Sequence, residues 1–302
     1  MKLRALSHYE GDTSTRFGDC ILIYDKQSIV VYDCGHVKHA ESVMEFLEST
    51  PSITQVHIVV SHNDGDHTNG VIGLLECLHN ENYTVTVYSP LYLKSVQEVL
   101  DLIDDGRRTK NATKNSILDT FDIIKDIVEN AQDYGFTVKN ATIGTTVSLC
   151  KIVGPAKDEF VAVVAKAVED GEVSQIDGET VMNAASVQLK CPLDNGSNAL
   201  LCGDASSEYL PDLSEYRVVQ LPHHGKYESA VNVLATIDPE NLGEYTFLIS
   251  DNTGNTNAGS DEFMKSTIRK GKVVKNTNNG APVEIGVKVY PTIQAARQNH
   301  GL

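Results

Sequence analysis

The sequence predicts an α/β fold in one domain over residues 1–302. Short apolar runs rich in β-branched residues, typical of buried strands, alternate along the chain with segments whose apolar residues recur at helical spacing. This alternation occurs in both halves of the chain, and no Pro-, Ser- or Gly-rich linker separates them. A single α/β domain with two similar halves therefore fits better than two independent domains.

The first half opens with a predicted hairpin and continues as helix, strand, helix, strand. Residues 19–24 (DCILIY) and 28–33 (SIVVYD) are apolar runs joined by the polar turn DKQ. The two helices each gather apolar residues on one face: Ala40, Val43, Phe46 and Leu47 in the first, and Val71, Leu74, Leu75 and Leu78 in the second. The two strands are residues 56–60 and 83–89, and residues 90–134 predict a helical insertion.

The second half repeats the pattern with further apolar runs. Its predicted elements are a strand at 145–155, a helix at 158–170, two strands around an Asn-Gly turn within 185–204, strands at 216–222 and 245–250, and a helix and a strand pair within 261–291. The strands at 216–222 and 245–250 are apolar enough to be buried.

Charge limits the partners that this chain can bind. Lysine and arginine number 25 against 41 aspartate and glutamate residues, which gives a formal net charge of −16. A field of that sign repels long phosphate polyanions, so a nucleic acid would need a local basic patch. Residues 106–114 (GRRTKNATK) and 265–275 (KSTIRKGKVVK) are the two candidates, whereas a small phosphodiester avoids the conflict.

The cysteines and the apolar runs indicate a cytoplasmic protein. None of the six cysteines forms a CxxC pair and most lie within apolar runs, which is typical of buried free thiols in a reducing compartment. No apolar stretch is long enough for a signal peptide or a membrane span. We therefore expect a cytoplasmic location and no membrane partner.

Residues 61–70 (SHNDGDHTNG) place several metal-binding side chains directly after a predicted strand. Alternate positions of an extended loop turn to one side, so His62 and Asp64 can face one point. Asp66 and His67 can then turn towards a second point. Imidazole and carboxylate groups together suit zinc, manganese or iron. The alternative is an acidic Asp-Gly-Asp turn with two surface histidines.

Two later segments favour the metal site over a plain acidic turn. The sequence NALLCGDASS puts Asp204 after an apolar strand, and VVQLPHHGKYES puts His223 and His224 after another. Three strand ends that each present His or Asp share one rim if the sheets stack, and such rims are where α/β proteins gather ligands.

Taken together, these motifs resemble the metallo-β-lactamase fold. The segment VVSHNDGDHTNG is similar to its signature loop, usually HxHxDH, although Asp64 stands in the position of the second histidine. With GDCILI, VVYDCG, LLCGDAS and LPHHG in this order and spacing, the chain from about residue 17 to 290 resembles the hydrolase domain of ComEC-type competence proteins. The resemblance implies a four-layer αβ/βα sandwich, in which two mixed sheets face each other with helices outside and metals at the rim.

The resemblance also implies which residues hold metal: His62 and Asp64 for one ion, Asp66 and His67 for the other, Asp204 bridging both, and one of the pair His223 and His224 completing the second site. His224 is the favoured ligand of that pair, which leaves His223 to contact phosphate or protonate a leaving group. Asp66 could also orient the attacking water.

Two departures from the family pattern change the expected metals. Asp64 replaces an imidazole by a carboxylate, which makes the first site harder and more anionic and favours Mn²⁺ or Mg²⁺ more than a three-histidine site would. Asn183, beside Ser186, stands where the fold normally has another histidine. The second site suits Zn²⁺ or Mn²⁺. We therefore expect one or two divalent metals, Zn²⁺ or Mn²⁺.

Side chains next to these motifs are weaker candidates. Lys226 and Tyr227 could stabilise a negative transition state and Asn183 could contact substrate, although surface placement explains the first two equally well. The charged residues of the early loops are expected to support the metal loop structurally: Asp19, Asp33 and His36.

The predicted function is a metal-dependent hydrolase that uses a metal-activated water. The resemblance favours a phosphodiesterase or nuclease, whose substrate is a phosphodiester-containing small molecule or a nucleic acid. The fold also hosts other hydrolases, so cleavage of a lactone, thioester or other carboxyl derivative is the alternative. A metal-binding module without turnover is a third hypothesis.

Overall fold

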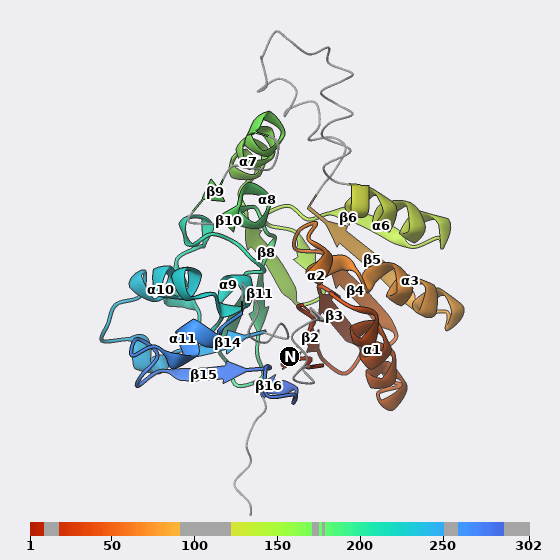
Figure 1. Cartoon of the computed structure of the whole chain (residues 1–302). Helices are drawn as coiled ribbons and strands as arrows, with labels where there is room; N and C mark the ends of the chain where they lie inside the picture. The colour runs from red at the N-terminus through yellow and green to blue at the C-terminus, as the bar shows by residue number, and fades with distance from the viewer. Residues whose placement is uncertain (9–17, 91–121, 171–174, 177–178, 251–258, 287–302) are drawn as a thin grey trace, which may run out of the picture.

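Two seven-stranded mixed sheets lie face to face in the part of the chain that the computed structural model describes, which comprises residues 1–8, 18–90, 122–170, 175–176, 179–250 and 259–286. Helices cover the outer faces of both sheets (Figure 1). The predicted four-layer αβ/βα sandwich is therefore confirmed.

The first sheet holds strands of the N-terminal half and one strand from the C-terminal region. In spatial order it contains β16 (Val283–Ile285), β1 (Lys2–Ala5), β2 (Ile21–Tyr24), β3 (Ser28–Tyr32), β4 (Gln55–Val59), β5 (Thr84–Ser89) and β6 (Thr137–Asn140). The strands from β3 to β6 run parallel to one another, while β16, β1 and β2 pair antiparallel. The carboxyl ends of β3 and β4 consequently meet at one edge of the sheet.

The second sheet has the same mixed character. In spatial order it contains β15 (Val273–Asn276), β14 (Thr246–Ile249), β13 (Val218–Gln220), β12 (Asn198–Leu201), β11 (Gln188–Pro192), β8 (Cys150–Gly154) and β7 (Thr146–Val147). The strands from β12 to β15 run parallel, and β11, β8 and β7 pair antiparallel. The loops that follow β12 and β13 thus leave from the same edge.

Helices complete the outer layers, except that α7 (Lys157–Asp170) lies at the top of the view, beyond both sheets (Figure 1). The helices of the first half are α1 (Val37–Ser49), α3 (Val71–Asn80) and α6 (Asp122–Asp133), and those of the second half are α7, α10 (Tyr227–Ala235) and α11 (Asp261–Lys265). Shorter elements are α2 (Gly65–Thr68), α8 (Val181–Ala184), α9 (Pro222–Gly225) and the small pair β9 (Gln175–Ile176) and β10 (Glu179–Thr180). None of the helices in the described part of the chain combines the length and apolar composition needed to cross a membrane.

Alternation of side chains along the strands builds the layers. In β2, Leu22 packs in one buried cluster with residues of α1 and α3, whereas Ile21 and Ile23 pack in the cluster between the two sheets. In β13, Val218 joins the cluster between the sheets and Val219 joins the one under α10. Successive side chains of a strand point to opposite faces, so a strand covered on both sides is apolar throughout.

The C-terminal strands differ from the prediction. We expected them to pair with each other, but β15 extends the second sheet beside β14, and β16 joins β1 in the first sheet. The strand-pair prediction was therefore wrong. The polar segment between Asn276 and Val283 is long enough to cross from one sheet to the other, so each strand completes a different sheet edge.

Two other predictions need adjustment. Residues 145–155 form the hairpin of β7 and β8 rather than one strand, because Ser148 adopts a left-handed φ of 53° and reverses the chain. Of the predicted insertion near 90–134, residues 91–121 lie outside the described residues. Its last part is α6, which packs Ile124 and Ile127 into the same cluster as α3 and so belongs to the outer helix layer.

Candidate metal centre

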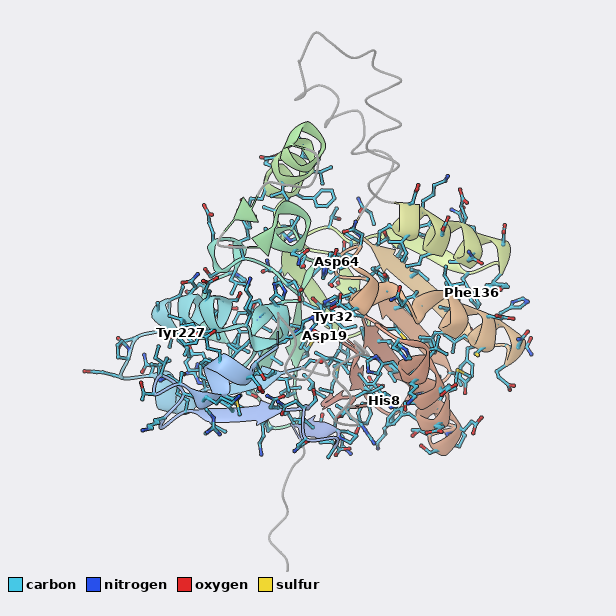
Figure 2. The ribbon with its side chains drawn as sticks, viewed as in Figure 1. His8, Asp19, Tyr32, Asp64, Phe136 and Tyr227 are labelled. Carbon is cyan, nitrogen blue, oxygen red and sulfur yellow. The ribbon has the colours of Figure 1, made fainter. Side chains whose placement is uncertain are left out.

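The loop after β4 carries the densest group of predicted ligands. His62 and Asp64 lie on the loop, with Nε2 of His62 3.7 Å from Oδ2 of Asp64. Asp66 and His67 lie on α2, which backbone hydrogen bonds hold against the neighbouring loops: the amide of Asp19 donates to the carbonyl of Asp66 at 3.0 Å. Figure 2 shows Asp64 and Asp19 between the two halves of the sandwich. The loop thus faces the second sheet.

Asp204 meets this loop from the second sheet. It follows β12 on a turn in which Gly203 has a φ of 53°. A Cβ at Gly203 would lie 2.9 Å from Cβ of Ser61, so only glycine allows this approach. Oδ1 of Asp204 lies 3.2 Å from Nε2 of His67, and its Oδ2 lies 3.9 Å from Nε2 of His62. His62, His67 and Asp204 place ligand atoms within 4.8 Å of one another, as a metal site requires.

The histidine pair after β13 faces the same point in a strained backbone. His223 and His224 have φ values of 50° and 53°, in the left-handed region that non-glycine residues rarely adopt. Such strain costs about 1–3 kcal/mol per residue and tends to occur at functional sites. Nε2 of His224 lies 3.1 Å from Oδ2 of Asp66, and Nδ1 of His223 lies 4.0 Å from Oδ2 of Asp204. Both rings therefore reach the candidate metal centre: the ring of His224 points towards Asp66, and the ring of His223 points towards Asp204.

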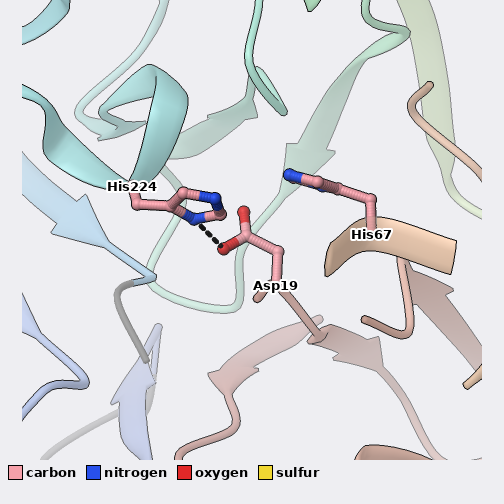
Figure 3. Close-up of side chains that lie close together, drawn as sticks. All are labelled: Asp19, His67 and His224. Atoms are coloured by element: carbon pink, nitrogen blue, oxygen red, sulfur yellow. Dashed lines mark hydrogen bonds and ion pairs between the residues drawn. The ribbon is translucent and has the colours of Figure 1, made fainter. Parts of the chain in front are cut away.

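Two buried carboxylates set the orientation of two of these rings. Oδ2 of Asp33 lies 2.8 Å from Nδ1 of His67. Oδ1 of Asp19 lies 3.0 Å from Nδ1 of His224, and Figure 3 shows this second contact. An ionised carboxylate only accepts hydrogen bonds, so Nδ1 of each ring is the donor and Nε2 is left to face the centre. Carboxylates commonly orient histidine ligands of metals in this way. These two contacts support the structural role expected for Asp19 and Asp33.

Asp19 also belongs to a second group whose ligand atoms lie within 4.8 Å of one another, with His67 and His224. Both of its carboxylate oxygens are already engaged. Oδ2 accepts a hydrogen bond from Nε2 of Gln220 at 2.7 Å, and Oδ1 accepts from Nδ1 of His224. A metal held by Asp19 would break the bond that orients His224, so Asp19 fits the supporting role better than the role of a ligand.

The buried polar atoms of the centre fit a divalent metal. Among the described residues, Nε2 of His62, Nε2 of His67 and Oδ1 of Asp204 are buried and form no hydrogen bond of ordinary geometry, although the last two atoms lie 3.2 Å apart as an ion pair. Buried polar atoms without a partner cost free energy, so natural proteins nearly always satisfy them. A cation among them would satisfy all three at once, and a mixed set of imidazole and carboxylate donors suits Zn²⁺ or Mn²⁺.

Charges in the centre keep its carboxylates ionised. Burial alone would raise the pKa of Asp66, but the hydrogen bond from His224 and its charge, with that of His67, hold the pKa well below its ordinary value. Burial also acts to raise the pKa of Asp204, and the charges of His67, His223 and His224 outweigh it. Both carboxylates are therefore ready to bind a cation at neutral pH.

The same ion pairs act on the histidines in the opposite direction. Burial alone would lower the pKa of His67, but the carboxylates of Asp204 and Asp33 raise it well above the ordinary value. Burial also acts to lower the pKa of His224, and the carboxylates of Asp19 and Asp204 raise it. In the absence of a metal, protons on these two rings balance the buried negative charge.

The remaining predicted residues lie at different distances from the centre. Nδ2 of Asn183 lies 3.5 Å from Oδ2 of Asp204, so Asn183 is at the centre. Lys226 is partly exposed at the start of α10. Tyr227 lines a separate surface hollow with residues of α11, and Figure 2 shows it away from Asp64. His36 caps the N-terminus of α1, where its Nδ1 accepts from the amide of Lys38 at 3.1 Å, so its contact supports a helix and not a metal ligand.

Sequence reasoning missed Ser61 and Gln220. Ser61 donates from its amide and its hydroxyl to the two oxygens of Asp33, each at 2.7 Å, and its hydroxyl lies 2.9 Å from Nδ1 of His62. Gln220 is fully buried and contacts Asp19. The available signal was a polar side chain inside or directly after an apolar strand, since such a residue needs a buried partner.

The likeness of this chain to known proteins is one of structure. No protein-family profile matches the chain, and no curated protein matches it in sequence. Among solved structures, a metallo-β-lactamase fold protein, YhfI from Bacillus subtilis, is similar with a TM-score of 0.47 and 12% identity, over 94% of this chain and 98% of YhfI. The short form of human tRNase Z has a TM-score of 0.42 and 12% identity, over 96% and 100% of the two chains.

The long form of RNase Z from yeast has a TM-score of 0.38 and 12% identity, and the match covers 82% of this chain and 37% of the yeast chain. The likeness to ComEC-type hydrolases, which depends on the sequence motifs, stays a prediction.

Proposed function

We propose that this protein is a metal-dependent hydrolase that cleaves phosphodiester bonds. The observation that carries the proposal is the convergence of ligand atoms of His62, His67 and Asp204 within 4.8 Å of one another, from loops of both sheets. The buried imidazole and carboxylate atoms among them, which form no hydrogen bond of ordinary geometry with other described residues, support a bound cation rather than a purely structural cluster.

The contacts of Asp204 support two metal positions. Its Oδ1 faces His67, while its Oδ2 faces His62 and His223. In our proposal Asp204 bridges the two positions. The full ligand set is His62 and Asp64 at the first position, Asp66, His67 and His224 at the second, and Asp204 at both.

Divalent cations held there would lower the pKa of a bound water and neutralise charge on a substrate oxygen, and a pair of them suits displacement at phosphorus. The side chains around them would position the reactants. In our proposal Asp66, which lies 3.1 Å from His224, also orients the attacking water. His223 is 16% exposed, whereas His224 is 1% exposed, so His223 is the ring that a substrate can reach. We therefore propose that His223 donates a proton to the leaving oxygen.

Charge favours a small substrate. The formal net charge is −16. Of the two basic segments, residues 106–114 lie outside the described residues, and residues 265–275 belong to α11, β15 and the turn between them. β15 is the edge strand and β14 separates it from β13, whose following loop carries the histidine pair. A long polyanion would therefore meet repulsion near the centre, and a small phosphodiester or nucleotide-like molecule fits better.

Hydrolysis of bis-p-nitrophenyl phosphate and of p-nitrophenyl acetate, each with Mn²⁺ or Zn²⁺, tests the proposal. We expect cleavage of the phosphodiester, its loss in Asp204→Ala and Asp66→Ala, and its retention in His79→Ala, which removes an exposed histidine of α3. Cleavage of the acetate alone would instead indicate a hydrolase of carboxyl derivatives. Bound metal with neither activity would indicate a module without turnover.

A second series of substrates tests the substrate class. Small diesters, single-stranded DNA and duplex DNA would be compared at the same metal concentration. We expect the small diesters to have the highest kcat/KM, and a faster reaction with either DNA would contradict the charge argument.

A further inference from the structure

Gln220 is a fully buried amide at the end of β13, in an otherwise apolar run. Both ends of its side chain are used. Nε2 donates to Oδ2 of Asp19 at 2.7 Å, and Oε1 accepts from the amides of Cys202 at 3.0 Å and Gly203 at 3.4 Å. One side chain thus joins a loop of the first sheet to the turn that precedes Asp204 in the second.

The Asp19 end of this bridge acts on His224. Gln220 occupies one oxygen of the Asp19 carboxylate, which leaves the other for Nδ1 of His224 at 3.0 Å. A carboxylate held by a fixed donor cannot rotate freely, so the direction of the second bond is also set. That bond, together with the carbonyl of Ser250 at 3.1 Å from the same Nδ1, points Nε2 of His224 towards Asp66, 3.1 Å away.

The opposite end acts on the turn that carries Asp204. The amides of Cys202 and Gly203 converge on Oε1, and this holds the chain where Gly203 has its φ of 53°. The next residue is Asp204, whose amide donates to Oγ of Ser186 at 3.2 Å. The two ends of Gln220 therefore control two proposed ligands that belong to different loops.

We infer that Gln220 is a positioning residue for the metal centre, which acts on His224 through Asp19 and on Asp204 through the backbone of residues 202–203. This inference rests on the proposed function, because it concerns the same site. A buried glutamine could also do no more than satisfy Asp19, and the two roles predict different effects on metal affinity.

Gln220→Met removes the amide and keeps the length of the side chain. Titration of the metal-free protein with Co²⁺, followed by visible absorption, should show binding weakened about 10- to 100-fold, the usual effect of losing a group that orients metal ligands. Gln188→Met is the matched control. Gln188 is equally buried on β11 and donates to the carbonyl of Tyr209 at 2.8 Å, so its loss should leave Co²⁺ affinity unchanged.

A double-mutant cycle shows whether Gln220 acts through Asp19. In an Asp19→Asn background, Gln220→Met should weaken Co²⁺ binding by a smaller factor than it does in the wild type, because the two residues share one contact chain. Fully additive losses would overturn this part of the inference. Gln220→Leu, which also removes the amide without adding a charge beside Asp19, gives the same measurement if thermal unfolding shows that Gln220→Met does not fold.

The outcomes separate this inference from the proposed function. If the wild type binds Co²⁺ and hydrolyses the phosphodiester while Gln220→Met binds equally well, the positioning role is wrong and the proposed function stands. Equal losses in Gln220→Met and Gln188→Met would also overturn it, because they would reflect general loosening of the buried sheet. A wild type that binds no Co²⁺ would overturn both.

Discussion

Asp33 and His67 are both fully buried and lie 2.8 Å apart, carboxylate oxygen to Nδ1. Asp33 ends the run that contains β3, and His67 lies on α2 after β4, so the contact spans two neighbouring parallel strands. When the ring is neutral, as metal binding requires, the contact fixes the proton of His67 on Nδ1 and leaves Nε2 free of a proton and facing Asp204. The carboxylate therefore helps to prepare a ligand without contacting the proposed metal.

Replacing Asp33 with alanine should weaken binding of Zn²⁺ or Mn²⁺ about 10- to 100-fold, because His67 loses the acceptor that orients it. Competition against a chromophoric chelator measures this affinity. Asp33→Asn is the control, since it keeps an acceptor oxygen and tolerates the φ of 60° at this position. We expect its loss to be smaller, and the same affinity in Asp33→Ala as in the wild type would contradict the orienting role.

Replacing Gly18 with alanine should displace residues 61–70, the loop that carries four of the proposed metal ligands. A Cβ there would lie 1.6 Å from the carbonyl oxygen of Asp66, so the backbone of α2 would have to move. The φ of 65° adds a cost of about 1–2 kcal/mol. Thermal unfolding should show a larger loss of stability than for Gly135→Ala, and metal content should fall.

Gly135→Ala measures the free-energy cost of the left-handed backbone alone. Gly135 has a φ of 75°, but a Cβ added there would have no atom of the described residues within 4 Å, so an alanine meets only the left-handed strain. This variant should lose about 1–2 kcal/mol and bind metal normally. Similar metal content in the two variants would show that the approach of Gly18 to Asp66 is unimportant for the site.

The strand ends that carry the candidate ligands were predictable from the sequence because each is a local pattern. His62, Asp204 and His224 each follow an apolar run by a few residues, and a parallel strand has to end at the same edge as its neighbour. The hydrogen bonds that support these ligands were harder to predict from the sequence. The hydrogen bond between Gln220 and Asp19 joins residues 201 positions apart, and it exists only because the two sheets pack face to face and bring these two loops together.

The partners of the C-terminal strands and the position of Tyr227 were also not predictable from the sequence. Strand character is local, so β15 and β16 were predictable as strands, but their partners depend on which sheet edges remain open after the rest of the chain has folded. Tyr227 follows the histidine pair closely in sequence. The turn through His223, His224 and Gly225, all at positive φ, directs the chain into α10, and Tyr227 lines the hollow beside α11.

The metal-free protein should lose stability as pH rises above neutral. The pKa of His67 is raised from its ordinary value of 6.5, so its ion pairs stabilise the fold fully below about 6.5 and less as pH rises through the folded-state pKa. Asp66 has a lowered pKa, and its contribution is present above 3.8 and lost as pH falls through the folded-state pKa. Thermal unfolding after chelation should therefore show the greatest contribution of these groups between about pH 4 and 6.5.

At high pH, bound metal should restore the stability that the metal-free protein loses. Because imidazole binds a cation only in its neutral form, binding must release the protons of His67 and His224, and affinity should increase with pH. Calorimetric titration in buffers of different ionisation enthalpy measures the proton release. Release of no proton at pH 7 would contradict the raised pKa values of both rings.

The two proposed metal positions should differ in affinity. The side chain of Asp64 is 42% exposed and lies 3.7 Å from His62, whereas that of Asp66 is 23% exposed and lies 3.1 Å from His224. A more exposed carboxylate is better hydrated and less rigidly placed, so it contributes less to binding a cation. Titration with Mn²⁺ should show a tighter and a weaker step. Asp64→Ala should remove the weaker step and Asp66→Ala the tighter one, and full activity with one equivalent of metal would show that the second position is not needed for catalysis.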